Sequence, residues 1–499
     1  MTYATHIDLY QLTSLVPHWD AQRANKPVWM SFFSRRLPKG HTGQSARSYL
    51  VWCGLHRCLQ VLSELHFDES RIKTLCNHPI LGPALQARPQ LVDQLRHWRF
   101  QGEVWAVEEG EVLWASPAVN IRGEPVDFDG IRPSAMPPYL QVYTDLLTAK
   151  LIETPLLSII NHMSMVATKA AHLTMAAKDR PILELGSRRT QINAAVDAAV
   201  AAYIGGVTGT SNIEANHLYG VPVIGTMDHF AVQSWEDQGQ PIGETEKAFF
   251  KAFAKTYPES ASLLVDTYDM FGEETGIRNA VRASQEVGVR LHGIRIDSQL
   301  SYETVNKARK LLDQLGATDT KIIVSGGVDE PLIRDLNEAP VDVFGVGERL
   351  VTSADAPVGV GAVGKLSWID GQTSMKRAKG SGKATLPGPI QAFRSERGDR
   401  LTIVPSHLST SHNHISFAWH NLSVEPDEQA LIQKVWDTNE HPTPPHTLTW
   451  LEDARLHRAE GVHRYESNSL PNLHSSKPKV YIDQSMIKAL EQKCVSRAK

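Results

Sequence analysis

The sequence lacks the features that would tie it to an oxidising compartment or to a membrane. Its 499 residues contain only four cysteines, too few for a disulfide framework, and reduced thiols suit the cytoplasm. No stretch approaches the ~20 apolar residues of a membrane span. The opening segment, MTYATHIDLYQLTSLV, has no basic region followed by an apolar run, as a signal peptide would. We therefore expect a cytoplasmic protein that does not bind membranes.

A strong excess of charge of one sign is also missing. Lys and Arg total 51 against 55 Asp and Glu, for a net charge of −4. Nothing in this balance favours nucleic acid or an anionic surface as a partner. Any anion that the protein binds must therefore bind at a local site.

The length and the residue patterns predict three regions. A chain of 499 residues is too long for one ordinary core. We expect an N-terminal α+β domain over 1–140, an α/β barrel over 141–365, and a connector with a C-terminal region over 366–499 that packs partly on the N-terminal domain. Within the first region, residues 28–33 are typical of a strand, and 102–107 with 112–115 are typical of a β-hairpin.

The middle region carries the pattern of buried parallel strands. Short apolar runs alternate there with helical patterns, as in a doubly wound sheet or a barrel. A barrel fits better, because reactive residue types follow the runs at the ends that converge on one mouth in such a fold. The seven runs are ILEL (182–185), YIGGV (203–207), VPVIG (221–225), SLLVD (262–266), VRLHGIRID (289–297), KIIVSG (321–326) and VDVFGVG (341–347).

Two glycine-rich loops close this region. Residues 325–331 (SGGVDEP) and 344–353 (FGVGERLVTS) each follow a strand and open a helix. Glycines at such places let backbone N–H groups approach a phosphate, and barrels often bind phosphate with their last two loops. The alternative is a pair of ordinary tight turns.

Charged side chains lie at or just after the ends of three of the other runs. Arg188 and Arg189 suit a bidentate grip on carboxylate or phosphate, with a solvated surface pair as the alternative. Arg295 and Asp297 share a face of their strand, as an ion pair or part of a site. Asp266 and Asp269 are candidate Mg²⁺ ligands or helix caps.

His229 follows VPVIGT, with Asp228 beside it. A single histidine is more often structural, but one just beyond a barrel strand is a candidate general base or phosphoryl acceptor.

Nine segments together resemble the nicotinate phosphoribosyltransferase family, and they occur in family order from residue 8 to residue 388. They are DLYQLT (8–13), ETPLLSIINH (153–162), GSRRTQ (186–191), YIGGVTGTSN (203–212), YGVPVIGTMDH (219–229), LLVDTYD (263–269), GIRIDS (293–298), FGVGERLVTSADAP (344–357) and GKATLPG (382–388).

The resemblance implies a type II phosphoribosyltransferase, with an irregular α/β barrel, an N-terminal α+β domain and a C-terminal extension. It implies a homodimer with active sites at the subunit interface. The implied reaction joins nicotinate to phosphoribosyl pyrophosphate, releasing nicotinate mononucleotide and pyrophosphate for NAD salvage, with Mg²⁺ as cofactor. ATP would be a co-substrate that transiently phosphorylates the histidine of GTMDH, which is His229.

The same resemblance implies roles for further residues. Tyr10 would stack on the pyridine ring from the partner subunit, and Asp297 would hold ribose hydroxyls or Mg²⁺. Arg188 and Arg295 would contact the ring substrate and the phosphates. The glycines Gly326, Gly327, Gly345 and Gly347 would lie near the 5-phosphate.

Ring choice depends on Ser211, where nicotinamide-specific relatives carry an aspartate. A neutral hydroxyl tolerates the carboxylate of nicotinate, so nicotinate is expected. The alternatives are a nicotinamide phosphoribosyltransferase on the same fold and a non-catalytic relative that binds pyridine nucleotides.

The sequence departs from the family pattern at three places, and the first two motivate the non-catalytic alternative. Leu185 stands where an aromatic residue usually closes the pyridine sandwich. Gln299-Leu300 replace the end of the usual DSGDL and remove its second acidic group. Asp228 stands where a small residue is common.

Overall fold

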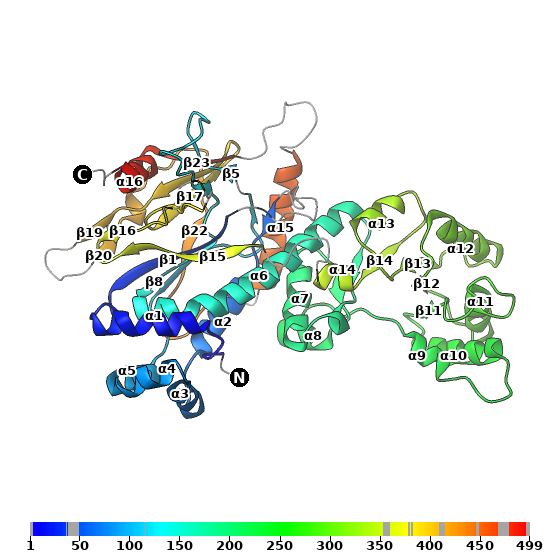
Figure 1. Ribbon diagram of the computed structural model, residues 1–499. Coiled ribbons are helices and arrows are strands. Elements are labelled where there is room, and N and C mark those ends of the chain that lie inside the picture. The colour runs from blue at the N-terminus through cyan, green and yellow to red at the C-terminus, as the bar shows by residue number, and fades with distance from the viewer. Residues whose placement is uncertain are drawn as a thin grey trace. The chain divides into compact units, whose positions relative to one another are not determined.

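The computed structural model describes residues 3–35, 37, 49–114, 116–352, 360–377, 380, 383–408, 415–445, 449–467 and 479–495. The chain divides into two compact units. Unit 1 comprises Met1–Met165 and Ala356–Lys499, and unit 2 comprises Val166–Asp355. Helix α6 (Leu146–Ala177) contains the boundary between them. Figure 1 labels the elements.

The main sheet of unit 1 is antiparallel and has the strand order β16-β15-β1-β8-β3-β22. Its strands are β1 (Pro27–Ser34), β3 (Glu103–Val107), β8 (Leu140–Asp145), β15 (Ala362–Ile369), β16 (Gln372–Thr373) and β22 (Ile432–Asp437). The strand predicted over 28–33 is confirmed in β1. Successive residues Val28, Trp29 and Met30 are all buried, so both faces of this strand are covered.

The predicted hairpin of 102–107 with 112–115 is wrong. Strand β3 pairs with β8 and β22, whereas β4 (Val112–Leu113) pairs with β2 (Leu50–Val51). The physical reason lies in the intervening turn, because the buried Glu109 carboxylate accepts hydrogen bonds from the backbone N–H groups of Gly54, Leu55 and His56. These bonds direct the chain toward the start of α2 (Leu55–Glu64) instead of back along β3.

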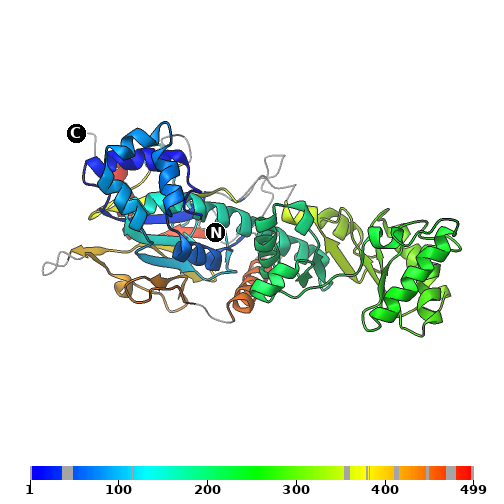
Figure 2. The same cartoon turned by 90° about the horizontal axis from the view of Figure 1, so that it is seen from below.

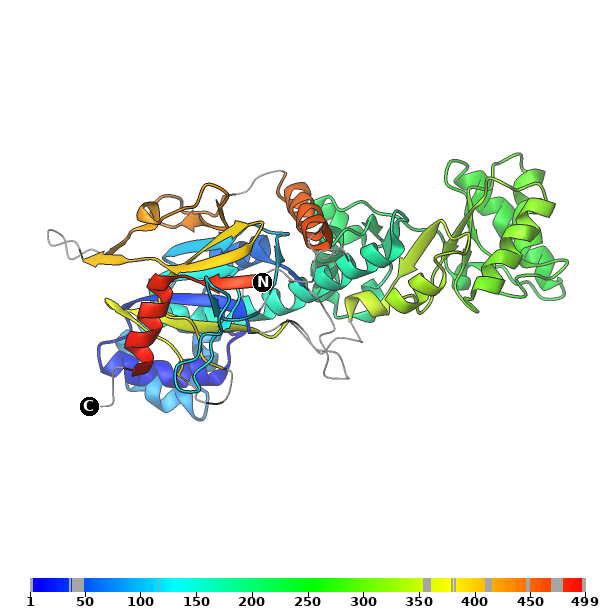
Figure 3. The same ribbon diagram turned by 90° about the horizontal axis from the view of Figure 1, so that it is seen from above.

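A second sheet of unit 1 has the order β21-β17-β18-β23-β6. Its strands are β6 (Val119–Asn120), β17 (Ile390–Ser395), β18 (Gly398–Ile403), β21 (Gln429–Ala430) and β23 (Lys479–Ile482). Figure 3 shows the red helix α16 (Gln484–Val495) against these strands. Two-stranded sheets join β2 to β4, β5 (Ser116–Pro117) to β7 (Ser134–Ala135), and β19 (Ser406–Leu408) to β20 (Ile415–Phe417).

The remaining helices of unit 1 are mostly N-terminal. They are α2, α1 (Leu9–Asp20), α3 (Glu69–Cys76), α4 (Leu81–Gln86) and α5 (Pro89–His97). Figure 2 shows the last four, in blue, gathered in one group. Near the other end of the chain are α15 (Trp450–Ser467) and the short 3-10 helix η2 (Trp419–Asn421).

Unit 2 contains a parallel six-stranded sheet with the order β10-β9-β14-β13-β12-β11. The strands are β9 (Ile182–Glu184), β10 (Gly209–Thr210), β11 (Ser262–Leu264), β12 (Gly293–Ile296), β13 (Lys321–Val324) and β14 (Val343–Val346). Between and after them come η1 (Ser187–Arg189), α7 (Ile192–Ile204), α8 (Ile213–Tyr219), α9 (His229–Gln233), α10 (Ile242–Thr256), α11 (Gly276–Glu286), α12 (Tyr302–Gln314), α13 (Glu330–Asp335) and α14 (Glu348–Val351).

Two of the seven predicted strands are wrong. Residues 203–207 end α7 and form the turn after it, and the strand itself is Gly209–Thr210. Residues 221–225 make only one bridge, between Val223 and Thr210. Proline at position 222 has no N–H group to donate to a strand ladder, which explains why pairing stops there.

The described residues therefore form a mixed α/β fold in which β10 and β11 are the outermost strands of the sheet, with the single bridge of Val223 beyond β10. Backbone hydrogen bonds do not close a barrel, so the closed barrel stays a prediction. No helix among the described residues is long and apolar enough to cross a bilayer. The four cysteines, all within the described ranges, form no disulfide.

Candidate active site

Most predicted site residues of unit 2 follow the carboxyl ends of its parallel strands, whereas Arg295 and Gly345 lie within β12 and β14, and His229 begins α9. These ends lie at one edge of a parallel sheet, and hydrogen bonds join the segments that follow β11, β12 and β13. Tyr10 is the exception, because it lies in unit 1 at the start of α1. It is 57% exposed, and burial of its remainder, with the charges of Glu153 and Asp8, raises its pKa.

His229 is the first residue of α9, and hydrogen bonding holds one edge of its ring. Its Nδ1 lies 3.0 Å from Thr267 Oγ1, and its Nε2 lies 3.9 Å from Asp266 Oδ1. The side chain is 39% exposed. Thr267 therefore fixes the orientation of the ring while leaving Nε2 accessible.

Asp228 is engaged in local structure rather than with the ring of His229. Its carboxylate accepts a hydrogen bond of 2.8 Å from Ala231 N and so caps α9. This cap explains an acidic residue at a position where the family commonly has a small one.

Asp266 links the ends of two strands. Its Oδ2 accepts hydrogen bonds from Asp297 N at 2.8 Å and from Ser298 Oγ at 2.6 Å. Its Oδ1 is buried and has no hydrogen-bond partner. A buried carboxylate oxygen without a partner is costly, and its position 3.9 Å from His229 Nε2 makes it available to a ligand or a cation.

Arg295 braces the segment that leads to His229. Its Nη1 donates to Thr226 Oγ1 and to Met227 O, each at 2.9 Å, and its buried Nε has no partner. The pKa of this guanidinium is lowered, chiefly by burial. The charge of Arg188 also lowers it, whereas the carboxylates of Asp297 and Asp266 act in the opposite direction. Because Arg188 contributes to this pKa, the two predicted arginines lie within electrostatic range of each other, and Arg188 itself is exposed.

Asp297 is held by the first glycine-rich loop. Its Oδ1 accepts a hydrogen bond from Ser325 Oγ. Next in the loop, Gly326 has a φ of +91°, and a Cβ on it would lie 1.9 Å from Asp297 O. Gly327 has a φ of +69° and open space around its missing Cβ. Gly326 is therefore required for close packing on Asp297, whereas Gly327 leaves room for a ligand.

Replacing Gly326 by alanine should lower kcat/KM by about 100-fold, because displacement of a site group by about 1 Å costs on that order. The matched control is Gly316→Ala, at a φ of +78° with nothing within 4 Å of its missing Cβ. Both variants carry the strain of a positive φ, but only Gly326→Ala displaces Asp297. Equal rates for the two variants would contradict this assignment.

The second glycine-rich loop packs on the segment after β9. A Cβ on Gly345 would lie 2.6 Å from Leu185 Cδ1 and 3.0 Å from the Cβ of Ser325, and one on Gly347 would lie 3.2 Å from Leu185 O. The structure thus accounts for both glycines through close approach to Leu185. Residues 353–357 of the family motif, and residue 382 of GKATLPG, lie outside the described residues.

Glu184 ties β9 to β10 beneath this loop. Its buried carboxylate accepts hydrogen bonds from Thr210 Oγ1 and Gly186 N, and its backbone carbonyl accepts one of 2.9 Å from Ser211 N. Burial raises the pKa of Glu184 despite the hydrogen bonds. Ser211 itself is exposed, which leaves its hydroxyl accessible at the end of β10.

Sequence reasoning missed the hydroxyl groups that hold the charged residues. These are Thr226, Thr267, Ser298 and Ser325. Only their positions could have indicated them in the sequence, because each lies within three residues of a predicted site residue.

The carboxylates fit a magnesium ion that is shared with a substrate. The described residues contain no cluster of three or more His, Cys, Asp or Glu side chains able to hold a metal. Mg²⁺ commonly takes only one or two carboxylates and completes its shell with water and phosphate oxygens. Asp266, with its buried unpartnered Oδ1, and the adjacent Asp297 match that requirement.

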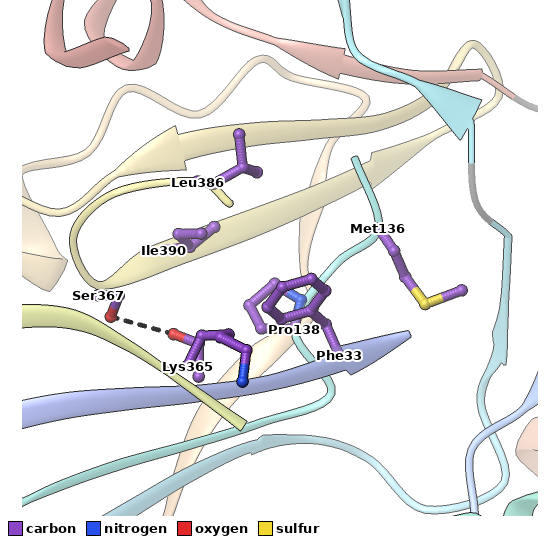
Figure 4. Close-up of a pocket in the computed structure, with 8 residues that line it drawn as sticks. Phe33, Met136, Pro138, Lys365, Ser367, Leu386 and Ile390 are labelled. Carbon is purple, nitrogen blue, oxygen red and sulfur yellow. Dashed lines mark hydrogen bonds between the residues drawn. The ribbon is translucent and has the colours of Figure 1, made fainter. Parts of the chain in front are cut away.

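Unit 1 contains a pocket whose lining includes none of the predicted site residues. It has an empty volume of about 300 Å³, including space open to solvent. Figure 4 shows Phe33, Met136, Pro138 and Ile390 along it, with Lys365 at one side. Burial lowers the pKa of Lys365, Glu153 raises it, and Arg35, Lys376 and Lys150 lower it. Several cations therefore surround Lys365.

The chain matches two family models. Residues 5–161 match the nicotinate phosphoribosyltransferase N-terminal domain, and residues 181–404 match the nicotinate phosphoribosyltransferase family. A nicotinate phosphoribosyltransferase of Mycobacterium tuberculosis is 38% identical over 391 residues, which cover 78% of each chain. One of Bacillus subtilis is 34% identical over 78% of this chain and 72% of its own length.

Two solved structures have the same fold. Human nicotinic acid phosphoribosyltransferase aligns with a TM-score of 0.74 at 24% identity, over 97% of this chain and 99% of its own. Nicotinate-nucleotide pyrophosphorylase from Pyrococcus furiosus aligns with a TM-score of 0.64 at 21% identity, over 93% and 96%. With the relatives of 34–38% identity, these matches show that the chain is an enzyme that belongs to the nicotinate phosphoribosyltransferase family.

Proposed function

We propose that the enzyme joins nicotinate to phosphoribosyl pyrophosphate at the edge of the unit 2 sheet where His229, Asp266, Arg295 and Asp297 meet, with Mg²⁺ and ATP, for NAD salvage in the cytoplasm. The observation that carries the proposal is the network of these four residues around two unpartnered buried atoms, Asp266 Oδ1 and Arg295 Nε. One is an acceptor and the other a donor, so the site is equipped for a cation and for an anion side by side.

The reaction needs stabilisation of opposite charges. As pyrophosphate leaves the anomeric carbon, positive charge develops on the ribose and negative charge on the leaving group, and fixed charges supply most of such catalysis. Arg188 and Arg295 would bind the phosphates, and Asp297 would orient the ribose hydroxyls. Mg²⁺ would neutralise pyrophosphate oxygens from a position beside Asp266 and Asp297.

His229 would accept the phosphoryl group of ATP. Its Nδ1 is engaged with Thr267, so Nε2 is the nitrogen available for phosphorylation. A phosphate there would lie near Asp266, Arg295 and the pyrophosphate, and its charge would couple ATP hydrolysis to substrate affinity.

A second subunit would complete the site. Tyr10 is exposed and would stack on the pyridine ring bound by the partner. The cations around Lys365 in the same unit would provide further positive charge for the phosphates. We also propose that the sheet of unit 2 belongs to a closed, irregular α/β barrel.

The neutral side chain of Ser211 is the basis for the choice of ring. It leaves the nicotinate carboxylate without a repelling charge, whereas an aspartate would favour the amide of nicotinamide. Leu185 would supply apolar contact to the ring but not aromatic stacking, which is worth about 0.5–1.5 kcal/mol.

The test is pyrophosphate release by wild type and by His229→Ala, with nicotinate or nicotinamide and with or without ATP. We expect wild type to prefer nicotinate and to be stimulated by ATP. We expect His229→Ala to keep its ATP-independent rate, within about threefold, and to lose the stimulation, because other groups supply the stabilisation of charge.

A control with Asp237→Asn, an exposed acidic residue beyond α9, should retain the ATP stimulation. Undiminished stimulation in His229→Ala would refute the phosphohistidine role. A strong preference for nicotinamide would refute the choice of ring.

A further inference from the structure

The buried carboxyl group of Glu246 lies outside the site described above. Glu246 is on α10 and is 0% exposed. It faces α11, the helix against which α10 packs in unit 2 (Figure 1). Its Oε2 accepts hydrogen bonds from Gly276 N at 2.8 Å and from Asn279 Nδ2 at 2.9 Å. Glu246 thus connects the middle of α10 to the first turn of α11.

This contact has more buried hydrogen-bond acceptors than donor hydrogens. Asn279 Nδ2 also lies 2.7 Å from Gly243 O and 2.6 Å from Glu274 O, so its two hydrogens serve three acceptors. Glu246 Oε1 and Asn279 Oδ1 are both buried without a partner. With an ionised Glu246 neither of these oxygens can donate, and both would remain unsatisfied.

One additional proton, placed between these two oxygens, would give both of them a partner. A carboxylic acid can pair with a side-chain amide at two points, since the acid O–H donates to the amide oxygen while the amide N–H donates to the other acid oxygen. The second of these bonds is present, from Asn279 Nδ2 to Glu246 Oε2. The first would join the two atoms that otherwise lack partners.

We propose that Glu246 is a protonated positioning residue, whose carboxylic acid pairs with the Asn279 amide and thereby fixes the segment 266–275 that presents Asp266 and Thr267 to His229. The effect on His229 rests on the function proposed above for that residue, whereas the protonated pair of Glu246 and Asn279 does not.

Hydrogen bonds lead from the pair to the segment. Asn279 binds Glu274 O, and Glu246 binds Gly276 N. Within the segment, Thr275 Oγ1 donates to Asp269 O at 2.7 Å. Ile277 N, just beyond the segment, donates to Met270 O at 3.1 Å. At its start are Asp266 and Thr267, the neighbours of the His229 ring. Both ends of the segment are therefore anchored, one at β11 and the other at the pair.

The surroundings favour the protonated form. Burial raises the pKa of Glu246 to about 7, although the hydrogen bonds from Asn279 and Gly276 lower it. No ion pair recorded within the described ranges includes Glu246. Most charged groups of the packed elements pair with one another: Lys247 with Glu244, Lys251 with Glu286, Arg278 with Glu273, and Arg282 with Glu274. Tyr268 donates to Glu236, and Lys255 is exposed.

The direction of the pH dependence follows from this raised pKa. The folded chain holds the proton more tightly than the unfolded chain, where the group has its ordinary value of 4.5. The contribution to stability is therefore full below about 4.5, declines as the pH rises toward about 7, and is absent above it.

The experiment compares wild type with Glu246→Gln, which mimics the protonated acid because its amide donates from the same place. In infrared difference spectra, wild type at pH 6 should have a carboxylic-acid carbonyl band that is absent at pH 9 and absent from Glu246→Gln. Between pH 6 and pH 9, the kcat of wild type and its ATP stimulation should decline on the order of tenfold more than those of Glu246→Gln, the scale of an indirect coupling between packed residues. Glu246→Ala should be impaired at both pH values, so that rescue is specific to glutamine.

The control is Glu244→Gln on the exposed face of the same helix, which should keep both the wild-type band and the wild-type pH profile. A wild-type spectrum at pH 6 without a band that Glu246→Gln removes would overturn the protonated pair. If the band is present but the pH profiles of wild type and Glu246→Gln coincide, the positioning role is wrong. An enzyme inactive with every substrate would instead refute the proposed function. The infrared band would still show whether Glu246 is protonated.

Discussion

Replacing Arg295 by alanine is expected to lower kcat/KM by about 100- to 1000-fold. The guanidinium has two roles that alanine removes together. It holds Thr226 and Met227 at 2.9 Å, which fixes the segment leading to His229, and its buried Nε has no partner and is the donor proposed above for an anionic substrate. Loss of one preorganised donor to developing negative charge costs on this order. Steady-state kinetics with nicotinate and phosphoribosyl pyrophosphate would measure the loss.

Two further variants separate the roles of charge and geometry. Arg295→Lys keeps the charge but not the planar fork of donors, so most of the loss should remain. Arg290→Ala removes an exposed arginine from the segment before β12, 4.0 Å from Asp319, and should leave kinetics unchanged. An Arg295→Ala enzyme within a few-fold of wild type would mean that the substrate does not use this arginine.

Breaking the buried ion pair of unit 2 should have the largest effect on stability. Lys169 of α6 binds Glu330 at the start of α13, with side chains only 1% and 6% exposed. Lys169→Met leaves a carboxylate buried without its counter-charge, which should lower the free energy of unfolding by about 3–5 kcal/mol. Urea denaturation followed by circular dichroism would measure the change.

Restoring neutrality should recover part of that loss. In the double variant Lys169→Met with Glu330→Gln, neither position of the former pair carries a charge, so the free energy of unfolding should exceed that of Lys169→Met alone. The exposed pair of Lys251 and Glu286, at 2.8 Å, provides the matched control, where Lys251→Met should cost less than about 1 kcal/mol. Equal losses at the two lysines would argue against a special role of burial.

Short runs of apolar residues correctly predicted most of the parallel strands of unit 2. Runs such as those before Asp266 and Asp297 are strands because a strand buried on both faces is apolar throughout. The error over 203–207 has the same cause. Helix α7 is rich in alanine and buried along most of its length, so its end has no polar face to distinguish it from a strand.

The site was predictable in its charged residues and not in what orients them. Arginines, carboxylates and glycines after strand ends carry a pattern, so His229, Arg295 and Asp297 could be named in advance. Neutral hydroxyls such as Thr267 are common in any loop and carry none. Glu246 was missed because a glutamate in an amphipathic helix normally lies on the solvated face, and only the structure reveals that this one faces α11.

The pairing of β1 with both β8 and β15 has a consequence for synthesis on the ribosome. Unit 1 draws its main sheet from residues on both sides of unit 2, and β15 and β22 emerge after all of Val166–Asp355 has been translated. Unit 2 has its sheet within one continuous segment and can fold first. Until β15 has been translated, β1 carries an unpaired and strongly apolar edge, and such an edge readily pairs with other chains. Nascent chains stalled near residue 355 are therefore the species most exposed to aggregation and to capture by chaperones.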